Sequence, residues 1–154
     1  MNTQDISKDN LSNSSLISDK LESIFSGQKE LMKDYKEIAE KHYQKIFGQE
    51  VKIKDEAWEG TNDNLHTKVG NFLIKDMLDA CIHELSETVQ TLKNWKSWKQ
   101  TEMMTDVDHF KEEIIDGLHF YIEACILAGM TAEEIHEIYF KKHAVNKFRQ
   151  NSLY

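Results

Sequence analysis

GNFLIKDMLDACIHELSETVQTLKN, residues 70–94, decides the fold class because its apolar residues recur every three or four positions. This spacing predicts one amphipathic helix over the whole stretch. The apolar side chains are Phe72, Leu73, Met77, Ala80, Cys81, Leu85, Val89 and Leu92. On the line through Leu73, Met77 and Ala80, however, the next two positions are Glu84 and Glu87. The stretch therefore predicts a helix that carries two carboxylates on its inward side.

Three other segments share the helical spacing, and they cover residues 18–48, residues 105–129 and residues 131–148. The last of them opens with TAEE, in which Thr131 and Glu134 form the capping-box pattern of a helix start. Four such helices, without alternating apolar and polar runs, predict an all-α fold, a bundle of four to five helices.

The segments between these helices lack a sustained period. Residues 48–68 carry mixed charge and predict a connection with a short helix, and the Trp/Lys segment at residues 94–99 predicts a loop. Residues 1–17 are rich in Ser, Asn and Asp, which favour local backbone hydrogen bonds, and predict a flexible N-terminal arm. We therefore expect one domain over residues 18–154.

Composition limits the classes of function. A formal charge of −8 argues against binding to duplex nucleic acid, because such binding needs a basic surface that displaces counterions. No apolar run approaches the roughly 18 residues of a membrane span. Cys81 and Cys125 occupy apolar helix positions without metal-ligand spacing, which predicts core thiols in a reducing compartment. These features predict a cytoplasmic protein that has no membrane or duplex partner.

A second predicted helix also carries two carboxylates on its apolar line. Along residues 105–129, Glu113 and Asp116 lie on the apolar line between Phe110 and Phe120. An inward carboxylate without a partner costs several kcal/mol, and four of them together repel each other, so the pattern makes sense around a cation. Oxygen ligands favour Mg²⁺ or Mn²⁺. The alternative is chance, since a helical chain with 27 acidic residues places many such pairs on solvated faces.

Other polar side chains are typical of nucleotide binding. Lys142, Asn146 and Arg149 lie on one face of the last predicted helix and could donate to phosphates, although a basic helix end also complements the helix dipole. Gln28 replaces an apolar residue in the first helix. Its amide could pair with a base edge, or it could be a hydrogen-bonded core glutamine.

The Trp/Lys segment offers aromatic faces beside cations. Trp95 and Trp98 could stack a nucleobase, and Lys96 and Lys99 could hold a phosphate. The alternative is a packed loop without a ligand. No sequence pattern of nucleophilic catalysis accompanies these residues.

Five blocks of the sequence resemble, in order, those of a known family. The blocks are LESIFSGQKEL (21–31), HELSE (83–87), NWKSWK (94–99), EEIIDGLHF (112–120) and LAGMTAEEIHEIYFKKHAVNKFRQ (127–150). They are similar to blocks of the all-α dimeric dUTPases and the phage dCTPase-dUTPases, within the MazG-like nucleoside triphosphate pyrophosphohydrolases. The resemblance implies an all-α NTP pyrophosphatase fold.

The resemblance also implies an activity. We expect Mg²⁺-dependent hydrolysis of dUTP to dUMP and pyrophosphate, with dCTP, or both nucleotides, as the alternative substrate. It implies metal ligands at Glu84, Glu87, Glu113 and Asp116, a catalytic role for the first two, and an enzyme in the host cytoplasm if the gene is phage-encoded. It implies phosphate contacts from Lys142, Asn146 and Arg149 and base contacts near Gln28 and Trp95.

Two expectations concern partners. The family usually forms homodimers, and the apolar line of Leu78, Ile82, Leu85 and Val89, opposite the acidic line, predicts a surface that a second copy would bury. The competing hypothesis is a non-enzymatic helical interaction module, in which the acidic residues merely form a charged surface.

Overall fold

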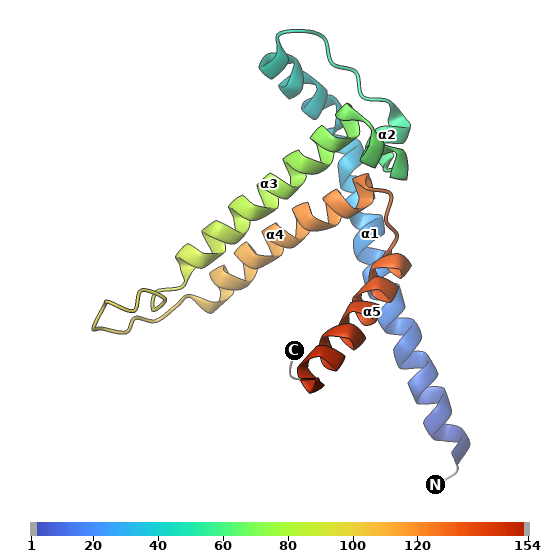
Figure 1. Cartoon of the computed structure of the whole chain (residues 1–154), viewed down its shortest axis with the longest axis vertical. Coiled ribbons are helices and arrows are strands. Elements are labelled where there is room, and N and C mark those ends of the chain that lie inside the picture. Colours follow the sequence, from blue (N-terminus) through green and yellow to red (C-terminus); the bar gives the residue numbers. More distant parts are fainter. Residues whose placement is uncertain (1–2, 153–154) are drawn as a thin grey trace.

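The computed structural model describes residues 3–152, with side chains from Lys20 onward. The elements are α1 (Thr3–Phe47), α2 (Asp55–Glu59), the 3₁₀ helix η1 (Asn62–His66), α3 (Lys68–Thr91), α4 (Val107–Leu127) and α5 (Ala132–Asn151). No strand occurs among these described residues, so the predicted all-α class is confirmed. Figure 1 shows the helices as a paired arm, α3 with α4, set across the long helix α1.

The first helix is longer than the sequence pattern predicts. It begins at Thr3, not near Ser18, and it ends at Phe47, directly before the predicted stop at Gly48, which adopts a φ of 67°. Neither proline nor glycine precedes Gly27, so no strong helix breaker interrupts propagation, and the Ser, Asn and Asp residues of this segment disfavour the helix only weakly. The predicted arm, residues 1–17, is therefore helical from Thr3, while its side chains lie outside the described residues.

Helices α3 and α4 lie side by side and are joined by a loop over residues 92–106. Their bounds fall close to the predicted ones, and Asp106 caps α4 by accepting from the backbone N–H groups of Asp108 and His109. Gly117 permits a close approach of the two helices, because a Cβ there would lie 3.1 Å from Leu85 Cδ2. We call this pair the arm.

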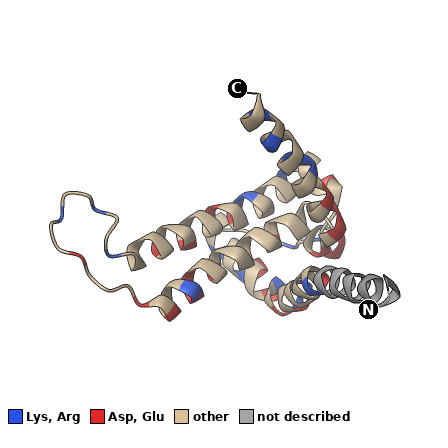
Figure 2. Cartoon of the chain, turned by 90° about the horizontal axis from the view of Figure 1, so that it is seen from below, with Lys and Arg blue, Asp and Glu red and all other residues tan. Residues whose placement is uncertain are grey.

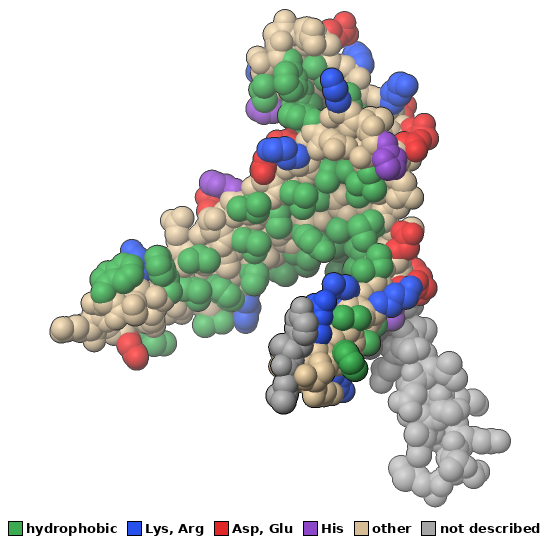
Figure 3. Space-filling view, in the orientation of Figure 1, with side chains coloured by type: hydrophobic (Ala, Val, Ile, Leu, Met, Phe, Trp, Pro, Cys, Tyr) green, Lys and Arg blue, Asp and Glu red, His purple; other side chains and the backbone are tan. Residues whose placement is uncertain are grey.

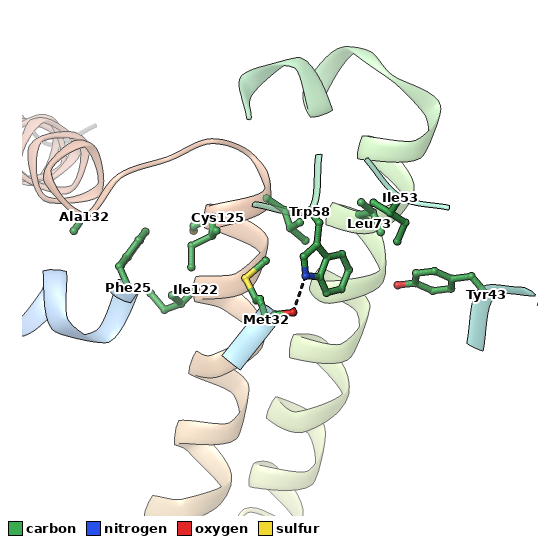
Figure 4. Close-up of a cluster of buried hydrophobic side chains, with 11 residues drawn as sticks. Phe25, Met32, Tyr43, Ile53, Trp58, Leu73, Ile122, Cys125 and Ala132 are labelled. Atoms are coloured by element: carbon green, nitrogen blue, oxygen red, sulfur yellow. Dashed lines mark hydrogen bonds between the residues drawn. The ribbon is translucent and has the colours of Figure 1, made fainter. Parts of the chain in front are cut away.

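The core lies where the middle of α1, the segment over residues 51–67, the start of α3 and the end of α4 meet; we call this region the junction (Figure 4). Trp58 is 3% exposed and donates from Nε1 to the Met32 carbonyl at 2.7 Å. The Asn64 amide donates to the carbonyls of Ala57 and Leu127, each at 2.7 Å. The segment over residues 48–68, which the sequence predicts as a connection, thus contributes buried side chains to the core.

Helix α5 starts at the junction and then leaves it (Figure 1). The predicted capping box is present between Thr131 and Glu134, and Ala132 is buried. From His136 onward every described side chain of α5 is exposed. Among the described residues no single helix is long and apolar enough to cross a membrane, and α4 and α5 meet that test only as a pair bent by 104°.

Candidate functional site

Three carboxylates meet on the arm. Glu84 and Glu87 come from α3 and Glu113 from α4, and each offers an oxygen within 4.8 Å of the others. The pairing follows from the arm itself, because two adjacent antiparallel helices bring the acidic line of one beside the acidic line of the other. We call these three residues the carboxylate cluster. Figure 2 shows acidic residues on both helices of the arm.

The predicted inward direction of the acids is partly wrong. Glu84 and Glu113 are half-buried, whereas Glu87 and Asp116 are exposed. Burial falls along α3 from Leu73, which is 1% exposed, because α1 covers the junction end of the arm and not its far end. Asp116 also lies outside the carboxylate cluster, so the structure brings together three of the four predicted metal ligands.

Two histidines accompany the cluster, and the sequence reasoning missed them. His83 Nε2 lies 3.3 Å from Glu87 Oε1, and His109 Nδ1 lies 3.6 Å from Glu113 Oε1. Both pairs have i, i+4 spacing, which places side chains next to each other on a helix and could have revealed them. A depression of about 330 Å³ opens beside the cluster, and Lys93 and Asp106 also line it. This hollow has the volume of a small-ligand site.

The donor set fits a divalent cation. Three carboxylates this close repel one another unless protons or a cation intervene. Their oxygens are hard ligands, which suit Mg²⁺ or Mn²⁺ better than metals that prefer sulfur or imidazole. The residues present therefore fit the ion that the sequence predicts.

The Trp/Lys loop forms the predicted aromatic and cationic surface. The rings of Trp95 and Trp98 are perpendicular, with centroids 6.0 Å apart, and Lys96 Nζ lies 5.2 Å from the Trp95 centroid. Trp98 is 71% exposed, so its ring is not part of a core. Asn94 closes the loop by accepting from the Met103 N–H and donating to its carbonyl. The last predicted member, Lys99, is exposed on the same loop.

Gln28 is a hydrogen-bonded core glutamine, which is one of its two predicted roles. It is 5% exposed and is held at both ends of its amide, because its Nε2 donates to Glu123 Oε2 at 3.1 Å and its Oε1 lies 2.9 Å from His119 Nδ1. It also lines a mostly apolar cavity of about 330 Å³, whose walls include Ile24, Ile115 and His119. We call this space the α1–α4 cavity. A buried amide therefore faces a space of ligand size.

The predicted base contacts do not meet within one chain. His119, the partner of Gln28, follows the start of α4 at Val107 by about twelve residues, or roughly 18 Å along the helix. The loop that carries Trp95 joins α4 at that start. Gln28 and Trp95 of one chain therefore cannot contact the same base.

The predicted phosphate donors also lie apart from the carboxylate cluster. Lys142, Asn146 and Arg149 are exposed on α5. Figures 1 and 2 both show α5 apart from the far half of the arm. Within one chain, the structure does not bring these side chains to the carboxylates.

A family comparison covers the cluster and the cavity. A family model described as dUTPase matches residues 20–128, which contain Gln28, the carboxylate cluster and the Trp/Lys loop, but not α5. A dCTP pyrophosphatase of Enterobacteria phage LZ5 is 37% identical in an alignment over 71 residues, with a coverage of 39% of this chain and 41% of that relative. The chain thus matches less than half the length of that relative. No solved structure matches the chain.

Proposed function

Because this chain belongs to the dUTPase family, we propose that it hydrolyses a pyrimidine deoxynucleoside triphosphate to the monophosphate and pyrophosphate. The first candidate substrate is dUTP. The phage relative supports dCTP, or both nucleotides, as the alternative. The observation that carries the proposal is the meeting of Glu84, Glu87 and Glu113 within the region that the family model matches.

The carboxylate cluster is the proposed Mg²⁺ site. Asp116 follows Glu113 by nearly one turn of α4 and is proposed as a fourth ligand. When bound, the ion would neutralise phosphate charge and make a water molecule more acidic. We propose that Glu84 or Glu87 accepts the proton of the attacking water, since a carboxylate within hydrogen-bond reach can act as a general base.

The α1–α4 cavity is the proposed base site. Its apolar walls suit the faces of a pyrimidine, and Gln28 offers both a donor and an acceptor for the edge. The exposed rings of Trp95 and Trp98, with Lys96 and Lys99, are proposed contacts to the nucleotide from a different direction. The separation of Gln28 from Trp95 means that a complete site needs more than one chain.

A homodimer is therefore part of the proposal. The predicted apolar line on α3 is exposed, from 41% for Leu78 to 62% for Ile82, and Figure 3 shows apolar side chains along the arm. Such a surface is typical of a protein interface. A second copy on the arm is the proposed source of the loop and α5 contacts, including Lys142, Asn146 and Arg149. Sedimentation at micromolar concentrations tests this, and a single chain mass throughout would overturn the dimer.

A substrate panel tests the activity. The protein is incubated with dUTP, dCTP and the other deoxynucleoside triphosphates in Mg²⁺, and pyrophosphate release is measured with and without a chelator. We expect pyrimidine turnover that the chelator abolishes. No turnover of either pyrimidine would reject the proposal and favour the interaction module. Calorimetry with Mg²⁺ separates the two independently, because a module predicts no saturable binding.

A further inference from the structure

We propose that Glu123 is a positioning residue that holds the Gln28 amide in one of its two orientations and so determines which pyrimidine base the enzyme prefers. The inference rests on the proposed function, in that it takes the α1–α4 cavity as the base site. It concerns a side chain that does not line that cavity and acts on it through Gln28.

The contacts around Gln28 define its orientation. Glu123 is 6% exposed on α4, and an ionised carboxylate only accepts hydrogen bonds, so the amide must turn its Nε2 toward it. The amide Oε1 then faces His119, whose Nδ1 must carry the proton that it donates. Reversal would place Oε1 against a carboxylate oxygen, lose the bond to Glu123 and require His119 to change to the Nε2–H tautomer. The amide is therefore fixed at both ends.

This orientation matters for a pyrimidine. Uracil presents an N3–H donor beside carbonyl acceptors, whereas cytosine presents an N3 acceptor beside an amino donor. A primary amide can pair with either edge, but the two pairings require opposite orientations of its oxygen and nitrogen. A freely rotating glutamine would accept both bases, and a fixed one discriminates between them. A correct pair of this kind discriminates between two bases by about tenfold or more.

The surroundings of Glu123 indicate that the carboxylate itself is needed. It lies ten residues after Glu113, roughly 15 Å along α4, so it does not belong to the carboxylate cluster. Burial and the nearby Asp76 on α3 raise the pKa of Glu123, and Asp76 in turn accepts from the Tyr43 hydroxyl at 2.8 Å. A glutamine would fill the same space without a buried charge. It would, however, offer both a donor and an acceptor to Gln28.

The first test uses Glu123→Gln and measures kcat/KM for dUTP and dCTP. We expect the preference of the wild-type protein for one base to fall about tenfold or more toward unity. The change should appear in KM, because the carboxylate cluster is untouched. Glu112→Gln, on an exposed position of α4, is the matched control. An unchanged preference in Glu123→Gln, or a wild-type protein without a preference, overturns the inference.

The second test does not depend on turnover. Nitrogen NMR of His119, assigned with a His119→Gln variant, should show the Nδ1–H tautomer in the wild-type protein and a mixture of tautomers in Glu123→Gln. A wild-type Nε2–H tautomer, or no change in the variant, rejects the positioning role even if the enzyme is active. Absence of pyrimidine turnover in the wild-type protein rejects the proposed function and the base preference. The tautomer then still decides whether Glu123 fixes Gln28.

Discussion

The junction and the far end of the arm are built in opposite ways. At the junction, Trp58 and Asn64 are almost fully buried and hydrogen-bonded, and no buried side-chain nitrogen or oxygen among the described residues lacks a partner. At the far end, Glu87 and Trp98 are exposed, and Met104 is 93% exposed. One region stabilises the fold, and the other leaves charged and apolar groups available to a ligand or to a second copy.

The largest effect is expected at the junction. Trp58→Ala removes a ring that fills the core and a donor to the Met32 carbonyl, so it should lower the free energy of unfolding by about 3–5 kcal/mol. Urea denaturation measures the change. Trp98→Ala, at an exposed position of the Trp/Lys loop, is the control. Its free energy of unfolding should stay within about 0.5 kcal/mol of that of the wild-type protein. Equal losses in both variants would contradict the contrast between the two regions.

The next effect belongs to the arm. Glu84→Gln keeps the shape of the side chain but removes a charge from the carboxylate cluster. Loss of a residue that only supports a metal ligand typically costs about 10- to 100-fold in activity. Because Glu84 is proposed as a ligand itself, kcat/KM should fall at least about 100-fold. Stability should be unchanged or slightly higher, because like-charge repulsion is relieved. Glu112→Gln should change neither property. Retained activity in Glu84→Gln, or a large loss of stability, would show that the cluster is structural.

The sequence predicts the parts of this molecule that depend on near neighbours. Helix α3 (Lys68–Thr91) follows from spacing, the cap at Thr131 from a capping box, and the stop at Gly48 from a glycine. The acidic lines also predict correctly that Glu84 and Glu113 come together. These signals act over a few residues, and no later packing step reverses them.

The remaining features depend on where distant segments cross. The Gln28–Glu123 bond joins residues 95 positions apart, and the bond from Asn64 to Leu127 spans 63. Helical periodicity predicts on which face of a helix a residue lies. It does not predict which part of that face another helix covers. The exposure of Glu87 and the separation of Gln28 from Trp95 were therefore beyond prediction, because both follow from the point at which α1 meets the arm.

A smaller effect is expected for Gly27→Ala, which should change the stability of α1 and nucleotide binding in different ways. Gly27 lines the α1–α4 cavity, and a Cβ built there meets no atom within 4 Å. Gly27→Ala should therefore raise the free energy of unfolding by about 0.5–1 kcal/mol through helix propensity. The added methyl group would enter the proposed base site and should raise KM for the preferred nucleotide.

Ser26→Ala, on the neighbouring exposed position of α1, is the matched control. It should leave KM unchanged, since Ser26 does not line the cavity. A Gly27→Ala protein that gains stability and keeps the wild-type KM would argue that the base binds elsewhere.

The smallest effect is a pH dependence at the edge of the junction. Burial raises the pKa of Glu123 above its usual 4.5, so the folded protein holds this proton more tightly than the unfolded chain. The stability that this group contributes is then fully present below the unfolded-state pKa and is lost as pH rises through the folded-state pKa. Glu123→Gln removes the titration and keeps an uncharged side chain of similar shape. The difference in unfolding free energy, variant minus wild type, should therefore increase with pH over this window.

Urea titrations from pH 4 to pH 8 measure that difference, and subtracting the wild-type curve removes the contribution of the seven histidines. Glu112→Gln, which removes an exposed carboxyl from the same helix, is the control for the loss of one negative charge. A difference that decreases with pH would mean that the Gln28 amide stabilises the Glu123 carboxylate more than burial destabilises it. In that case the amide would be held more firmly at neutral pH than the burial of Glu123 implies, and the loss of base preference in Glu123→Gln should be correspondingly larger.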